Sequence, residues 1–169
     1  MKLMHTCPSL SRKGFTIIEM LIVVTILTML AGILVPILEE ESAIARDGRR
    51  ASDLRSVASA LANYKDRNGD YPTTSGTWQG DAGNFGGMGY DAAGYIPNLV
   101  PDYLPYLPQD PDPQFPNPTD GGYMYRSDGS DFKFVISSTA TTYYVSNPFF
   151  DPTRPTIGWQ VSSPGGYTW

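Results

Sequence analysis

The chain has 169 residues and a formal net charge of −5, from 12 lysines and arginines against 17 aspartates and glutamates. Nonspecific binding to nucleic acids requires the opposite sign of charge, so the composition argues against a nucleic-acid partner. The single cysteine, Cys7, and the single histidine, His5, lie among the first 14 residues. The rest of the chain therefore lacks disulfides, thiol nucleophiles, histidine bases and the commonest zinc ligands.

Residues 1–14 form a short basic leader that contains Lys2, Arg12 and Lys13 and no acidic residue. The leader has no apolar segment of its own, which a conventional secretory signal peptide would have before its cleavage site. The apolar segment instead begins at Phe15, directly after Gly14. We therefore treat residues 1–14 as a leader that takes no part in the fold.

Residues 15–38 are an apolar run whose single charged residue is Glu19. A helix rises 1.5 Å per residue, so this run would span roughly 36 Å and could cross a hydrocarbon core of about 30 Å. A carboxylate in lipid is costly and normally has a partner. Two interpretations of Glu19 follow: its side chain extends to the membrane interface, or it has a function.

The start of the apolar run has the sequence KGFTIIE at residues 13–19. A basic leader ending in glycine, then an aromatic residue, a threonine, two aliphatic residues and a glutamate, resembles the prepilin processing site of type IV pilins and type II secretion pseudopilins. The resemblance covers residues 12–38, and Ile17 stands where leucine is more usual. It implies that a membrane aspartyl peptidase cuts after Gly14 on the cytoplasmic side and methylates the new amine of Phe15.

The same resemblance assigns assembly roles to Glu19 and Pro36. Cleavage would create a cation at Phe15, and pairing it with Glu19 of a neighbouring subunit would lower the cost of burying both charges. Pro36 removes a backbone hydrogen bond from the helix interior, so we expect a kink or local loss of helix near Gly32 and Pro36. In filaments of the resembled family, this part of the helix loses its regular bonding on assembly. The implied partners are copies of the chain, a prepilin peptidase, an inner-membrane assembly platform and minor pilins or pseudopilins.

The charges that flank the apolar run do not by themselves fix its orientation in a membrane. Arg12 and Lys13 precede the run and three glutamates at residues 39–41 follow it, which favours a cytoplasmic N-terminus. Arginines also follow within about 20 residues and favour the opposite orientation; these are Arg46, Arg49, Arg50 and Arg55. The processing motif decides for a single-pass inner-membrane protein with a cytoplasmic N-terminus and an external or periplasmic C-terminal domain.

Residues 39–67 are predicted to continue the helix as an amphipathic one. Apolar residues recur at steps of three, four and seven; they are Ile44, Ala51, Leu54, Val57, Ala58, Leu61 and Tyr64. The remaining faces carry polar residues such as Arg49, Arg50 and Asp53. The apolar stripe should pack on the C-terminal domain, and Asn68-Gly69 should end the helix because glycine adopts the left-handed conformation readily.

Residues 68–169 are rich in proline and glycine but hold most of the aromatic residues, which suffice for a small, loop-rich core. Residues 123–126 and 132–136 alternate around SDGSD at 127–131, which predicts a β-hairpin, and residues 141–145 are a candidate third strand. Frequent prolines in 99–118 predict an extended connector, and 78–95 is predicted to be a glycine-rich surface loop. The predicted fold is α+β: a long N-terminal helix, transmembrane and then amphipathic, packed on a small antiparallel sheet with long Pro/Gly-rich loops.

Two segments of this C-terminal domain resemble the major pseudopilin of type II secretion systems: NGDYPTT at 68–74 and YLPYLPQDP at 103–111. In that family a tryptophan and a glycine usually follow the second Asp-Pro, whereas this chain has DPQFP at 112–116. The departure leaves both a minor pilin and a divergent pseudopilin open.

The major pseudopilin family also holds a calcium ion in its C-terminal loops. Several carboxylates here could supply oxygen ligands; they are Asp110, Asp112, Asp120, Asp128 and Asp131. Their spacing matches no defined calcium loop. For Asp128 and Asp131, the candidates we consider, turn formation is the favoured interpretation, because aspartate and glycine are the residues that such turns require. Calcium therefore stays an alternative, and no other cofactor is expected.

Three functional classes remain. The leading one is a structural subunit of a pseudopilus or type IV pilus-like filament, serving type II protein secretion, with a minor type IV pilin in adhesion or DNA uptake as its variant. The second is a membrane-tethered glycan-binding module that would use the aromatic residues of 78–95 as a platform. The third is an enzyme, which would depend on carboxylates alone, as in glycoside hydrolysis. The sequence offers no paired-carboxylate arrangement, so we expect no catalytic activity.

Overall fold

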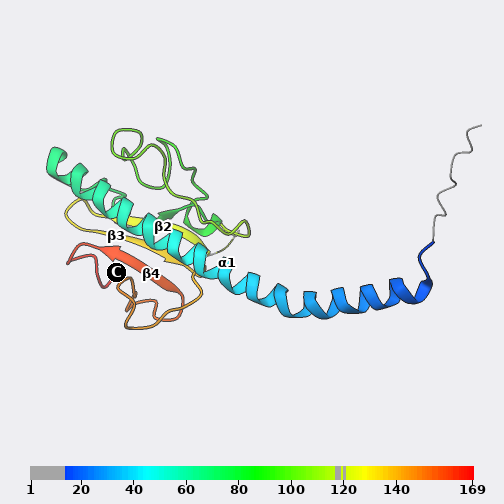
Figure 1. Cartoon of the computed structure of the whole chain (residues 1–169). Helices are drawn as coiled ribbons and strands as arrows, with labels where there is room; N and C mark the ends of the chain where they lie inside the picture. Colours follow the sequence, from blue (N-terminus) through cyan, green and yellow to red (C-terminus); the bar gives the residue numbers. More distant parts are fainter. Residues whose placement is uncertain (1–13, 117–118, 120) are drawn as a thin grey trace, which may run out of the picture. The chain divides into compact units, whose positions relative to one another are not determined.

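The computed structural model describes residues 14–116, 119 and 121–169. The leader residues Cys7 and His5, and the calcium candidate Asp120, lie outside the described residues. The chain divides into two compact units, Met1–Glu41 and Ser42–Trp169. Helix α1, Ile17–Asn68, begins in the first unit and ends in the second (Figure 1).

In the first unit α1 is an apolar helix whose described side chains are all exposed. It is the one helix in the described part of the chain that is long and apolar enough to cross a membrane. The hydroxyl of Thr25 donates to the carbonyl oxygen of Leu21 at 2.7 Å, and that of Thr28 donates to the carbonyl oxygen of Thr25 at 2.9 Å. These bonds satisfy the polar side chains inside an apolar helix.

Helix α1 is continuous through Gly32 and Pro36. The local loss of helix that the sequence predicted is therefore absent from the single subunit. A proline removes one backbone hydrogen bond, and local adjustment of the neighbouring groups keeps the helix in place. Loss of helix on assembly stays a prediction.

In the second unit α1 buries one face. Leu54, Val57 and Leu61 are completely buried, and Ala51 and Tyr64 pack against the same core, as the predicted apolar stripe requires. The stripe fails at its first member, because Ile44 is 63% exposed. The apolar face of the helix is therefore covered from Ala51 onward.

The end of α1 agrees with the prediction. Gly69 follows the last helical residue with φ +90°, and its N–H donates to the carbonyl oxygen of Lys65 at 2.8 Å. The amide of Asn68 donates to the carbonyl oxygen of Tyr64 at 2.8 Å. The bond from Gly69 satisfies the carbonyl of Lys65, which has no partner within the helix, and the side chain of Asn68 adds a second donor at the carbonyl of Tyr64.

The second unit contains one antiparallel sheet of four strands in the order β1-β2-β3-β4. The strands are β1, Gln79–Gly80; β2, Gly122–Ser127; β3, Phe132–Ser137; and β4, Gly158–Ser162. Strands β2 and β3 form the predicted hairpin, in the register Tyr125 to Phe134. In Figure 1 the second half of α1 runs across this sheet.

The predicted third strand at 141–145 is wrong, because strand β4 takes that place beside β3. The backbone N–H of Thr141 donates to the side chain of Asp47 at 3.0 Å instead of to a strand. Tyr144 and Val145 then project outward, 69% and 79% exposed. A side-chain acceptor on α1 therefore competes successfully with strand pairing.

Aromatic residues form the centre of the core between α1 and the sheet. Tyr95 stacks on Phe134 with 6.2 Å between ring centroids, and Tyr123 meets Phe134 edge-on at 5.8 Å. The buried hydroxyls have partners: Tyr95 donates to the carbonyl oxygen of Pro108 at 2.7 Å, and Tyr123 donates to Asp53 at 2.9 Å. The small aromatic core predicted from composition is present.

The two loop predictions differ in outcome. Within 99–116 the described residues form no helix or strand, as expected, but Leu99 and Leu107 are completely buried, so the segment is part of the core as well as a connector. The segment 78–95 is not a simple surface loop. It contributes β1, a short 3-10 helix at Gly83–Phe85 and the buried side chains of Asp81 and Tyr95.

Candidate processing and assembly site

The predicted cleavage site is exposed and lies just outside the helix. Residues 14–16 are non-helical, and Phe15 is 79% exposed. A Cβ added at Gly14 would meet no other atom within 4 Å. The fold of this chain therefore places no demand for glycine at position 14, and a requirement for it would come from a processing enzyme.

Thr16 and Glu19 cap the start of α1 reciprocally. The carboxylate Oε2 of Glu19 accepts from the backbone N–H of Thr16 at 2.8 Å and from its hydroxyl at 2.7 Å. The backbone N–H of Glu19 donates to the hydroxyl oxygen of Thr16 at 3.3 Å. This pattern is a capping box, which satisfies N–H groups that the first turn of a helix leaves without partners.

The capping box gives Glu19 a role that the sequence analysis did not predict, although a threonine followed three residues later by a glutamate is the usual signature of a capping box. The capping box uses one oxygen of the Glu19 carboxylate. Oε2 accepts both bonds, and Oε1 accepts none from the described residues. The pairing of Glu19 with Phe15 of a neighbour stays a prediction, as does the assembly role of Pro36, which lies inside the continuous helix.

The calcium candidates Asp128 and Asp131 both hold backbone and hydroxyl groups. Oδ1 of Asp128 accepts from the N–H groups of Ser130 at 3.0 Å and Asp131 at 2.8 Å, which closes the hairpin turn. Oδ1 of Asp131 accepts from the hydroxyl of Ser163 at 2.6 Å and the N–H of Gly165 at 3.0 Å. Among the described residues no three His, Cys, Asp or Glu side chains come together as metal ligands. These contacts favour turn formation for Asp128.

The calcium candidate Asp110 instead binds Arg50, which the helical pattern had placed on a polar face. The guanidinium of Arg50 donates through Nε to Oδ2 of Asp110 at 2.8 Å and through Nη2 to Oδ1 at 2.6 Å. It also donates to Asp47 at 2.8 Å. Burial disfavours the charged guanidinium, but the hydrogen bonds to Asp110 and Asp47 outweigh it and raise the pKa of Arg50 above its ordinary value.

A second buried cation, Lys133, joins the sheet to the end of the chain. Its ammonium donates to Asp151 at 2.9 Å, to the hydroxyl of Thr153 at 2.8 Å, and to main-chain oxygens of Tyr167 at 3.2 Å and Trp169 at 2.9 Å. Burial opposes ionisation of the Asp151 carboxyl, but hydrogen bonds from Lys133 and Thr153 outweigh it and hold the pKa of Asp151 below its ordinary value. The strand pattern alone gave no signal for this pair.

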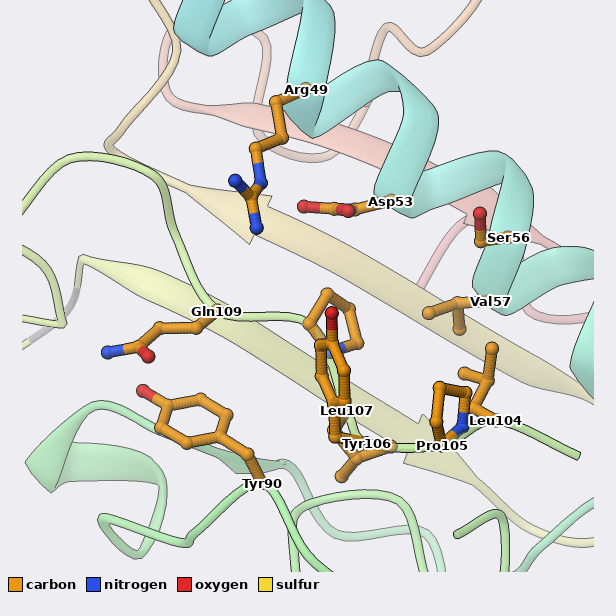
Figure 2. Close-up of a pocket in the computed structure, with 11 residues that line it drawn as sticks. Arg49, Asp53, Ser56, Val57, Tyr90, Leu104, Pro105, Tyr106, Leu107 and Gln109 are labelled. Carbon is orange, nitrogen blue, oxygen red and sulfur yellow. The ribbon is translucent and has the colours of Figure 1, made fainter. Parts of the chain in front are cut away.

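An open groove of about 460 Å³ lies between α1 and the proline-rich segment 104–109. Figure 2 shows Arg49, Asp53 and Ser56 of α1 on one side, and Tyr90 and Gln109 on the other. Burial raises the pKa of Asp53, and the nearby charge of Arg49 opposes that shift. Among the described residues, the guanidinium of Arg49 takes part in no hydrogen bond, and Asp53 accepts the hydroxyl of Tyr123 on Oδ2 and nothing on Oδ1. This surface, called the groove below, mixes aromatic and proline carbon with polar groups that have spare hydrogen-bonding capacity.

The glycan platform suggested for 78–95 is not assembled. The guanidinium of Arg154 lies over the ring of Trp78 at 4.7 Å, and that of Arg126 lies over it at 5.9 Å. Tyr90 and Tyr95 meet edge-on with 6.3 Å between centroids and belong to the groove and the core. The aromatic residues of 78–95 therefore do not form one stacking surface.

Comparison with known proteins finds a family at the start of the chain and relatives along most of it. The family described as "Prokaryotic N-terminal methylation motif" matches residues 10–35. The chain is similar to "Type II secretion system core protein G" of Pectobacterium carotovorum subsp. carotovorum, with 33% identity over 124 residues, 67% of this chain and 72% of the relative. The proteins of the same name are 32% identical over 108 residues in Aeromonas hydrophila (59% of this chain, 67% of the relative) and 29% identical over 147 residues in Escherichia coli (strain K12) (80% and 93%). No solved structure matches the chain.

The matched residues 10–35 contain the exposed Gly14-Phe15 bond, the Thr16–Glu19 capping box and most of the apolar part of α1. The similarity to the relatives extends beyond this motif, since it covers 124 residues in one of them. The predicted family and the predicted function as a structural subunit of a pseudopilus are both confirmed. The chain belongs to the family of type II secretion system core protein G.

Proposed function

We propose that this chain is cut between Gly14 and Phe15 by a prepilin peptidase, methylated on Phe15, and built into a type II secretion pseudopilus through its apolar helix. The observation that carries the proposal is the methylation motif at 10–35, placed on an exposed, non-helical segment directly before a helix of membrane-spanning length. The side chains in the apolar window of that helix are uncovered by the rest of the described chain. They are available to lipid before assembly and to other copies after it.

Glu19 would select and hold the incoming subunit. Its Oε2 is engaged by Thr16 of its own chain, whereas Oε1 is free among the described residues to accept from another group. Cleavage would supply that group, because the backbone nitrogen of Phe15 becomes a cationic amine. In low-dielectric surroundings, a carboxylate and an amine that bind each other cost less to bury than either alone.

The proposed topology has the N-terminus in the cytoplasm and the unit Ser42–Trp169 outside or in the periplasm. The methylation motif at 10–35 supports this topology, because the resemblance places its cleavage on the cytoplasmic side. The charges that flank the apolar run do not decide between the two orientations. The partners would be copies of the chain, the prepilin peptidase, an inner-membrane assembly platform and minor pseudopilins. The chain would act mechanically and would catalyse no reaction.

Mass spectrometry of the membrane-extracted protein tests the processing step. We expect a mature N-terminus at Phe15 that carries a methyl group. Gly14→Val should leave the chain uncut, and because a side chain at position 14 meets nothing in the fold, the uncut chain should fold normally. Ser9→Val is a matched control within the leader and should be cut. A wild-type protein that retains residues 1–14 in the presence of the peptidase would contradict the proposal.

A further inference from the structure

The groove exposes polar groups with spare hydrogen-bonding capacity on one face of α1. Arg49, Asp53 and Ser56 follow each other at steps of four and three, so they share this face. Asp53 accepts the hydroxyl of Tyr123 on Oδ2 at 2.9 Å, and Oδ1 accepts no bond from the described residues. Opposite them, Tyr106 is 63% exposed. A volume of about 460 Å³ lies within the range of surface pockets that hold ligand groups.

A loop at residues 138–148 lies against a different face of α1 and projects outward. Tyr144 and Val145 are 69% and 79% exposed, which makes Val145 one of the most exposed large apolar side chains of the second unit. Both lie close to Phe149, with which they line neighbouring hollows. The guanidinium of Arg55 lies over the ring of Phe149 at 5.0 Å, so Arg55 marks the face of α1 on which this loop lies.

The loop and the groove therefore lie on opposite sides of α1. Each helical residue turns about 100°, so Asp53 in the groove and Arg55 beside the loop point about 200° apart. When two different surfaces on opposite sides of one subunit bind each other in successive copies, the contact is heterologous, or head-to-tail. Repetition of such a contact gives an open helical filament unless the rotation closes a ring.

The charges of the two sides are complementary. Residues 68–125, which supply the outer wall of the groove, contain seven aspartates and neither lysine nor arginine. Asp91 and Asp102 in this segment are exposed and form no ion pair with the described residues. On the loop side, residues 138–148 are uncharged and the exposed cation is Arg55. An uncharged loop flanked by an arginine would thus meet a groove whose lining charges, Arg49 and Asp53, balance and whose outer wall carries carboxylates.

We propose that Tyr144 and Val145 of one copy insert into the groove of the next copy in the pseudopilus. The apolar rings and prolines of the groove would cover Val145 and the ring of Tyr144, while Asp53 Oδ1 would accept the tyrosine hydroxyl. Arg49 would donate to carbonyl oxygens of the loop, and Arg55 would lie against the acidic segment. The proposal rests on the filament function proposed above.

Disulfide cross-linking in assembled filaments tests the contact. The full-length chain with Cys7→Ser has no other cysteine, so introduced pairs report a single contact. Val145→Cys and Gln109→Cys in the same chain place one thiol on the loop and one in the groove. After mild oxidation of purified filaments, we expect a ladder of dimers, trimers and larger multimers on a non-reducing gel, with more than half of the monomer band lost.

The control is Val145→Cys combined with Ser130→Cys. Ser130 is exposed, and its main-chain oxygen accepts from Lys65, beyond the α1 residues 49–57 that line the groove. The control pair should give at least tenfold less multimer than the groove pair. If the double variant does not assemble, each single-cysteine variant can be mixed with the Cys7→Ser parent, and we expect filaments from each mixture. Disulfide-linked dimers should then form only when Val145→Cys and Gln109→Cys chains are present in the same filament. The proposal would be overturned if filaments assemble but the groove pair stays monomeric, or if the groove pair gives no more multimer than the control pair. A parent chain that is cut at Phe15 but forms no filament would instead count against the proposed function, and this inference would fall with it.

Discussion

Arg50 and Asp110 form a buried, two-point ion pair that joins α1 to the proline-rich segment. Their atoms meet at 2.8 Å (Nε to Oδ2) and 2.6 Å (Nη2 to Oδ1), and the two side chains are 1% and 0% exposed. The pair has a fixed geometry because the planar guanidinium matches both carboxylate oxygens. It holds residues 60 apart in sequence within the unit Ser42–Trp169.

The first prediction is that the fragment Ser42–Trp169 folds alone and is soluble without detergent. This unit contains the complete sheet, the buried part of α1 and both buried cation networks. Well-dispersed amide signals in an NMR spectrum would confirm the prediction, and sharp signals collapsed into a narrow range would contradict it. The full-length chain, which carries the apolar run 15–38, should need detergent under the same conditions.

The second prediction is that Asp110→Asn strongly destabilises this unit. The change leaves the charge of Arg50 buried with one carboxylate, Asp47, and loss of a partner from a buried pair costs about 3–5 kcal/mol. Urea unfolding followed by tryptophan fluorescence measures the effect, because all three tryptophans lie within residues 42–169.

Asp112→Asn is the matched control for Asp110→Asn. Asp112 is two residues away and forms a looser ion pair with Arg46, at 3.4 Å and with side chains 30% and 19% exposed for Arg46 and Asp112. Such partly exposed pairs contribute up to about 1 kcal/mol. Equal losses of unfolding free energy in the two variants would show that the buried pair of Arg50 and Asp110 contributes no more than the partly exposed pair, which would contradict the prediction.

The third prediction concerns the pH dependence of stability at Asp81. This carboxyl is 6% exposed, and burial raises its pKa to about 6, although it accepts from the N–H of Tyr123 at 2.8 Å. The folded state therefore favours the protonated form. The stability that Asp81 contributes is fully present below about pH 4 and is lost as the pH rises to about 6. At about 1.4 kcal/mol per pKa unit, the loss is roughly 3 kcal/mol.

Asp81→Asn removes this titration and keeps an oxygen that accepts from Tyr123. We expect the variant to equal the wild type near pH 4 and to be more stable by roughly 3 kcal/mol at pH 7. The measurement is the difference between the two unfolding free energies at each pH, which cancels the titration of other carboxyls. Asp91→Asn, which removes a carboxylate at an exposed position, is the matched control. Parallel pH profiles for Asp81→Asn and the wild type would refute the prediction.

The sequence predicted the features that depend on neighbouring residues. The motif around Gly14 and Phe15 is contiguous, and the turn at Asp128 lies between the two strands that it joins, so each could be recognised within about ten residues. Strand β4 could not be predicted in this way, because Gly158–Ser162 pairs with β3 across a long loop and has a weak alternating pattern. The third strand was therefore predicted wrongly at 141–145, whereas β4 is the strand that pairs with β3.

The buried charges were missed for a related physical reason. Helical periodicity places Arg50 on a polar face, and it is the carboxylate of Asp110, from a distant loop, that allows it to be buried. Lys133 likewise sits in a strand that alternation would expose on one face, and it is buried because Asp151 and the end of the chain supply its acceptors. Hydrophobic patterns reflect the free energy of burying each side chain by itself, and they contain no information about distant partners that lower the cost of burying a charge.

The last prediction separates the two roles of Glu19, capping of its own helix and pairing with Phe15 of a neighbour. Glu19→Gln keeps an acceptor for the N–H of Thr16, because glutamine also serves in a capping box, but it removes the charge. Glu19→Val removes both. If pairing with the Phe15 amine controls assembly, both variants leave a buried cation without its partner, at a cost of about 3–5 kcal/mol. Subunit addition should then weaken by at least about a hundredfold in both.

Filament yield by electron microscopy, with cleavage after Gly14 checked by mass spectrometry on the same samples, distinguishes the outcomes. Loss of filaments in both variants, with normal cleavage and methylation, is the result that charge pairing predicts. Filaments from Glu19→Gln but not from Glu19→Val would assign the effect to the capping box formed with Thr16. Normal filaments from both would show that the carboxylate only extends to the membrane interface, since removing a charge from lipid is favourable by itself. Because Oε2 is held by Thr16 while Oε1 is unoccupied among the described residues, we expect the first outcome.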